Sequence, residues 1–79
     1  MNDNQLLQRI NVSSGIMIGK PVVKGTRLTV DFVLGQLAHG ASVEEICVEY
    51  KGLKPEDIQA CLLFATKTLQ DTEFMPLAS

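Results

Sequence analysis

Three cations, Lys20, Lys24 and Arg27, fall within eight residues of this 79-residue chain, and Lys51 and Lys54 follow further along. Lysine and arginine side chains bind phosphate groups through charge-assisted hydrogen bonds, so these residues are candidates for contacting nucleic acid. The formal net charge is nevertheless −2, because the second half of the chain is rich in acids. A mildly acidic protein is not a general polyanion binder, so any DNA contact must be local.

Catalytic chemistry has little support in the sequence. The only histidine, His39, precedes a glycine at a predicted helix end, where it interacts with the helix dipole. Cys47 and Cys61 lie on apolar helix faces and lack the spacing of metal ligands. Neighbouring acids such as Glu44 and Glu45 do not share a helix face, so they make poor acid–base or metal pairs. We therefore predict no catalytic residues, no metal and no cofactor.

The elements that must position the cations are a β-arm and three helices. Residues 1–28 contain glycines and β-branched residues, which predict an irregular β-arm or hairpin. A helix is predicted after Thr29, a good N-cap, and a second after Ser42, which forms a capping box with Glu45. A third begins near Pro55, a favoured first helical residue. Its predicted inner face comprises Ile58, Cys61, Leu62, Ala65 and Leu69.

We expect one domain over residues 1–79, mainly α, with a β-arm at 1–28, a three-helix, helix-turn-helix-like core at 29–69 and a tail at 70–79. A chain this small buries little apolar surface, which favours a homodimer. The N-terminus lacks the basic start and apolar run of a signal peptide, and no apolar stretch is long enough to span a membrane. The expected location is therefore the cytoplasm.

The most informative string is Gly19-Lys20-Pro21-Val22-Val23-Lys24-Gly25-Thr26-Arg27. It resembles the G-K-P-x-[IV]-x-G-T-R signature of the prokaryotic domain of unknown function 433 family. Residues 41–46 and 52–58 are similar to the second and third landmarks of that family. The resemblance implies a homeodomain-like or winged helix-turn-helix fold and, for some members, an antitoxin that pairs with a PIN-like ribonuclease toxin. Lys54 departs from the family, which often has a Thr or Ser N-cap there.

Two binding functions remain open. In a helix-turn-helix unit the start of the second helix faces the major groove, where Gln59 could read adenine. The residues expected to contact operator DNA are Lys20, Lys24, Arg27, Lys51, Lys54 and Gln59. The alternative is a protein–protein module without DNA binding, which dimerises or neutralises a nuclease. Its expected contacts are Ile16, Met17, Ile18, Val22, Val23 and Phe32, unless the arm folds back over its own helices.

Overall fold

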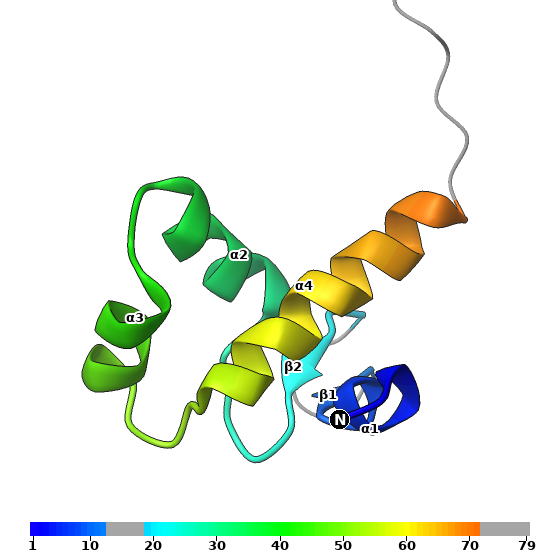
Figure 1. The fold of residues 1–79 in the computed structure, drawn as a ribbon, viewed down its shortest axis with the longest axis horizontal. Coiled ribbons are helices and arrows are strands. Elements are labelled where there is room, and N and C mark those ends of the chain that lie inside the picture. The colour runs from blue at the N-terminus through cyan, green and yellow to red at the C-terminus, as the bar shows by residue number, and fades with distance from the viewer. Residues whose placement is uncertain (13–18, 72–79) are drawn as a thin grey trace, which may run out of the picture.

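The computed structural model describes residues 1–12 and 19–71. Its elements, labelled in Figure 1, are α1 (Asp3–Leu7), β1 (Ile10–Asn11), β2 (Val22–Val23), α2 (Val30–Ala38), α3 (Val43–Glu49) and α4 (Pro55–Gln70). The chain is mainly helical with one short antiparallel strand pair, which confirms the predicted class at that level. The predicted partner contacts Ile16, Met17 and Ile18 lie outside the described residues.

Helix α1 was not predicted, and its presence corrects the assignment of residues 1–28 to a β-arm alone. Asn2 caps the helix by accepting from the Gln5 N–H at 2.8 Å, and the Gln5 side chain accepts from the Asn2 N–H at 3.0 Å. This reciprocal capping box satisfies two otherwise unpaired donors. The helix has only five residues, which is too short to show an apolar repeat in the sequence.

Strand β2 is paired along both of its edges. On one side Ile10 of β1 lies opposite Val23, in antiparallel register. On the other side an isolated bridge joins Val22 to Thr29. The second contact is a single bridge and not a further strand, because Val30 already begins α2. The described part of the arm therefore pairs within its own protomer.

The predicted starts of α2 and α3 are confirmed. Thr29 accepts from the Phe32 N–H at 3.1 Å, and Ser42 accepts from the Glu45 N–H at 3.1 Å. Hydrogen bonds from the backbone and side chain of Ser42 hold the pKa of the Glu45 carboxyl below its usual value. Gly40 follows α2 with a φ of 98°, the left-handed conformation that suits a residue after a helix.

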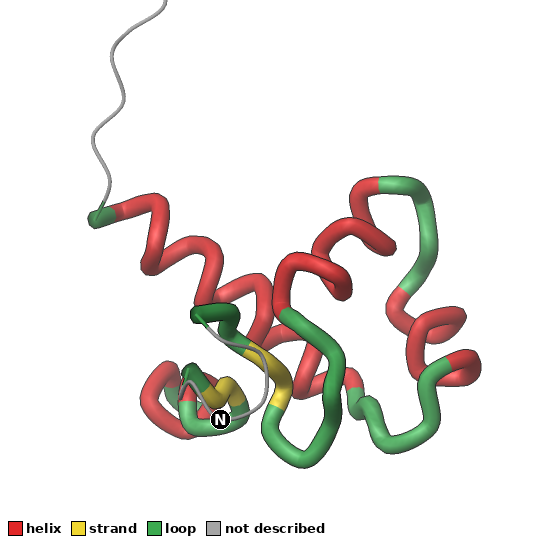
Figure 2. Tube along the Cα trace, turned by 180° about the vertical axis from the view of Figure 1, so that it is seen from behind, coloured by secondary structure: helices red, strands yellow, loops and turns green. Residues whose placement is uncertain are grey.

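Helix α4 is the central element, since α1, β1, α2 and α3 all pack against it. Figure 1 shows it crossing the molecule diagonally, and Figure 2 shows the same arrangement from behind. The core cluster consists of Ile10, Val23, Val30, Val33, Ile46, Leu53, Ile58, Ala60 and Cys61.

Val22 and Val23, two of the predicted partner contacts, are 3% and 0% exposed, so the folded protomer does not present them on its surface. Their side chains are already buried within their own chain.

Two residues of the predicted inner face of α4, Leu62 and Leu69, are 47% and 57% exposed. The helical repeat identified the apolar edge of α4 correctly but not which part of that edge the rest of the chain covers.

Candidate nucleic-acid interface

Two turns lie at the same end of the molecule, at the lower edge of the views in Figures 1 and 2. One joins β2 to α2 and the other joins α3 to α4. Between them they carry Lys24, Arg27, Lys51 and Lys54, all of which are exposed. We call these four residues the cationic end.

The β2–α2 turn has a defined internal structure. Gly25 adopts a φ of 83°, which glycine reaches without the steric cost of a Cβ. The Thr26 hydroxyl donates to the Val23 carbonyl at 2.8 Å and accepts from the Leu28 N–H at 3.0 Å. The Gly-Thr pair therefore shapes the turn, while Arg27 is left exposed to solvent. Neither Lys24 nor Arg27 forms an ion pair with any acid in residues 1–12 or 19–71.

A polar hollow of about 340 Å³ connects the β2–α2 turn to the start of α4. It is lined by Met1, Gln5, Gln8, Arg9, Lys24 and Asp57. Lys24 also donates its backbone N–H to the Arg9 carbonyl at 2.8 Å. The first turn of α4 and the cation that follows β2 are thus neighbours in space, although more than 30 residues separate them in the chain.

Asp57, in the first turn of α4, is buried rather than directed to solvent. Acids at the start of a helix that faces DNA would repel phosphate, but Asp57 is only 6% exposed. Arg9 Nη1 donates to Asp57 Oδ1 at 2.9 Å, and the Lys54 N–H donates to Asp57 Oδ2 at 2.9 Å. The charge of the carboxylate is therefore compensated by Arg9. The same carboxylate caps α4, because the Lys54 side chain makes no capping hydrogen bond. Its charge does not oppose the cationic end.

Sequence reasoning missed Arg9 entirely. Nothing local to Arg9 signals a partner 48 residues away. A partial signal existed at Asp57, since it stands three residues after the N-cap position Lys54, where an acid closes a capping box.

Lys20 is not part of the cationic end. It precedes β2, whereas Lys24 follows that strand, and its ammonium lies 3.7 Å from Asp31 Oδ2 in the first turn of α2. Gln59, the predicted base reader, is exposed on α4 one turn after Pro55. Five of the six expected DNA contacts, all but Lys20, are therefore exposed on the two turns or the adjoining start of α4.

Phe32, the last predicted partner contact, is 37% exposed on α2. Its ring packs edge-on against Tyr50, with centroids 5.4 Å apart and planes at 90°. The pair closes the junction between α2 and the end of α3, and leaves part of the Phe32 ring accessible.

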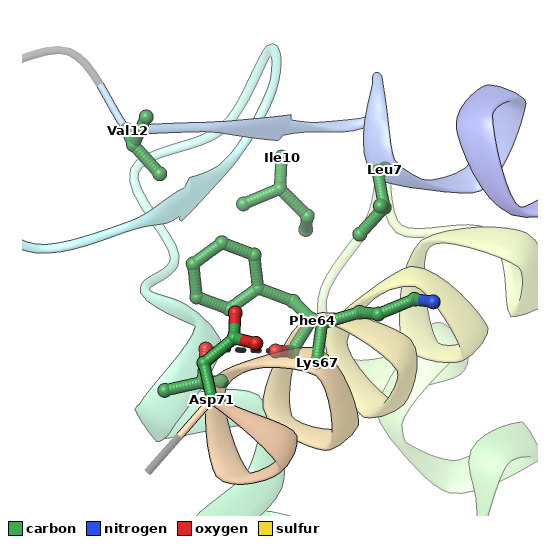
Figure 3. A pocket seen from close by; sticks show the side chains of 7 residues that line it. Leu7, Ile10, Val12, Phe64, Lys67 and Asp71 are labelled. Carbon is green, nitrogen blue, oxygen red and sulfur yellow. Dashed lines mark hydrogen bonds between the residues drawn. The ribbon is translucent and has the colours of Figure 1, made fainter.

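Two hollows flank Phe64 on the C-terminal half of α4. The first, of about 330 Å³, is shown in Figure 3, where Leu7 and Ile10 face the Phe64 ring and Lys67 extends away from it. The second, of about 320 Å³, lies between α4 and α2 and includes Leu34 and Leu69. The second hollow is mainly apolar, whereas the lining of the first also includes Lys67, Thr68 and Asp71. Neither hollow is lined by a residue of the cationic end.

Burial raises the pKa of the Cys61 thiol to about 11, with a further contribution from the charge of Asp57. A thiol with so high a pKa is a poor nucleophile at neutral pH. In the described part of the chain no three His, Cys, Asp or Glu side chains gather in a way that could hold a metal ion. Nor does any helix of the described residues have the length and apolar character needed to cross a membrane.

Comparison with known proteins agrees with the motif string. A family model described as "Protein of unknown function (DUF433)" matches residues 10–65, well over half of the chain. A crystal structure of a DUF433 member protein from Anabaena variabilis ATCC 29413 is similar, with a TM-score of 0.72 and 26% sequence identity. The match covers 85% of this chain and 67% of that one. No curated protein matches the sequence. This chain therefore belongs to the DUF433 family of proteins of unknown function.

Proposed function

We propose that this protein is a helix-turn-helix-like DNA-binding regulator of antitoxin type, which contacts the phosphate backbone through its cationic end. The observation that supports the proposal is that the β2–α2 turn, which carries Lys24 and Arg27, and the α3–α4 turn, which carries Lys51 and Lys54, lie at the same end of the fold. The two turns are separate in the chain, so it is the fold that places them at one end of the molecule.

The surroundings of the cationic end favour an anionic partner. Two acids stand in the first turn of α4 close to Lys54: Asp57 is buried against Arg9, and Glu56 is half-buried. The positive end of the α4 dipole lies in the same region and adds to the attraction for phosphate. Phosphate contacts of this kind position a protein on DNA without specifying sequence.

The test is a salt-titrated gel shift against DNA upstream of the gene. If each protomer of a dimer neutralises about three phosphates, log K falls with log salt with a slope near −5. The double variant Lys24→Ala, Arg27→Ala should bind more weakly and with a slope near −2, because each protomer loses two contacts. Both side chains are exposed, so its free energy of unfolding should change by less than about 0.5 kcal/mol.

Lys67→Ala provides the matched control. Lys67 lies 13 residues after Lys54, roughly 20 Å along α4, and pairs with Asp3 at 3.8 Å. Its removal should leave the affinity and the slope unchanged. Equal affinity in the wild type and in the double variant would reject the cationic end as the contact. Absence of a shift at low salt would reject DNA binding.

The partner-binding alternative rests on Phe32, whose ring is partly accessible beside Tyr50. Under this hypothesis the protein neutralises a PIN-like ribonuclease without contacting DNA. Co-expression with a nuclease encoded beside the gene should then give a complex that Phe32→Ser weakens and that salt leaves intact. If the complex dissociates in salt and tolerates Phe32→Ser, the contact lies elsewhere.

A further inference from the structure

The apolar groove between α2 and the C-terminal half of α4 has no occupant within the described residues. Its volume is about 320 Å³. The apolar lining consists of Pro21, Val30, Leu34, Phe64, Ala65 and Leu69. Asp31 and Thr68 complete it as the only polar side chains. Carbon-lined hollows of this kind are filled by apolar side chains in stable assemblies.

Two leucines project beside the groove. Leu62 and Leu69 are separated by two helical turns, so they lie on one edge of α4. They are 47% and 57% exposed. Helix α2 has nine residues, about 14 Å, whereas α4 has sixteen, about 24 Å. The shorter helix cannot cover the whole apolar edge of the longer one, which explains why the predicted inner face of α4 is only partly buried.

We propose that a second copy of this chain covers this face, with the exposed leucines of each copy packing into the groove of the other. A two-fold interface uses the same patch on both subunits, so the patch must carry both the projection and the hollow that receives it. The α2–α4 face meets that requirement, since Leu69 projects from the groove that it helps to line.

The charge distribution on the face also favours a second copy. Asp31 is the one charged residue lining the groove, and Lys20 pairs with its carboxylate at 3.7 Å. The helix positions beside the leucines include Thr66 and Thr68, which carry no charge. Two copies of a chain with net charge −2 can therefore approach through this face without placing like charges together. A strongly basic or acidic partner would find no complementary charges here.

The size of the face sets the strength of the association. The exposed edge of α4 with α2 beside it is roughly 24 Å long and one to two helix diameters wide. Two such faces bury on the order of 1,000 Å², the lower end for a specific interface. We therefore expect a reversible dimer whose population depends on concentration. The face lies on the far half of α4 from the cationic end, so this inference does not depend on DNA binding.

Sedimentation velocity of the full chain over a wide range of concentrations tests the proposal. The wild type should shift from monomer to dimer as the concentration rises. Leu69→Glu should raise the dimer dissociation constant by at least about 100-fold, because it places an unpaired carboxylate in the apolar contact. Val48→Glu is the matched control: Val48 is 79% exposed on α3, away from the groove, and the dissociation constant should not change.

Circular dichroism verifies that both variants keep the wild-type fold. A wild type that stays monomeric up to millimolar concentration would overturn the proposal. So would a dimer that Val48→Glu disrupts and Leu69→Glu does not.

Discussion

Arg9 and Asp57 lie 48 residues apart in the chain, and their side chains meet with 2.9 Å between Nη1 and Oδ1. The other carboxylate oxygen of Asp57 accepts from the Lys54 N–H at 2.9 Å. One carboxylate thus ties the segment between α1 and β1 to the start of α4. Because Asp57 is buried and Arg9 is about one quarter exposed, the pair is screened less than a surface ion pair.

Asp57→Ala should lower the free energy of unfolding by about 2–4 kcal/mol, since it removes a buried hydrogen-bonded pair and the cap of α4 together. Urea unfolding measures the change. Glu56→Ala, the adjacent half-buried acid, should cost less than about 1 kcal/mol. A double-mutant cycle with Arg9→Gln should give a coupling of about 1 kcal/mol or more. Additive effects of the two substitutions would show that the pair contributes no interaction energy.

Thr26→Val should destabilise the protein by about 1–2 kcal/mol, because valine keeps the shape of threonine but loses both hydrogen bonds of the β2–α2 turn. Thr66→Val is the control, since the exposed Thr66 hydroxyl donates only to the Leu62 carbonyl within α4. Thermal unfolding of the two variants makes the comparison. Similar melting temperatures would mean that the Thr26 hydroxyl does not stabilise the turn.

If α4 reads bases, Gln59→Ala and Lys54→Ala should weaken DNA binding in different ways. Gln59→Ala should reduce the preference for the upstream sequence over random DNA by about 1–3 kcal/mol and leave the salt slope unchanged. Lys54→Ala should weaken both DNAs equally and reduce the slope by about one unit. Competition binding with the two DNAs distinguishes the effects. An unchanged preference in Gln59→Ala would limit the protein to backbone contacts.

The raised pKa of Cys61 predicts both its reactivity and a pH dependence of stability. The ordinary value is 9.0 and the folded value is about 11, so the folded state favours the protonated thiol. Its contribution to stability is complete below pH 9 and is lost as the pH rises through 11. Thiol labelling at pH 8 should modify Cys61 only when the chain unfolds. Rapid labelling of Cys61 in the folded protein would contradict its burial.

The starts of α2, α3 and α4 could be predicted because the signals at Thr29, Ser42 and Pro55 are local. The four residues of the cationic end were also predicted as DNA contacts from the sequence. That the two turns lie at one end of the molecule could not be predicted, since it depends on how α4 packs. The Arg9–Asp57 ion pair could not be predicted because the two residues are 48 positions apart in the sequence. Periodicity marked Leu62 and Leu69 as apolar positions, yet burial also depends on the length of the neighbouring helix.

The ion pair has a practical consequence for defining the domain. The family match starts at Ile10, one residue after Arg9. A protein trimmed to the matched range would retain the Asp57 carboxylate and lose the guanidinium that compensates it. It would also lose α1, which packs on α4. The family match therefore covers a smaller unit than the one stabilised by the Arg9–Asp57 pair and the packing of α1 on α4. Expression trials should retain the first nine residues.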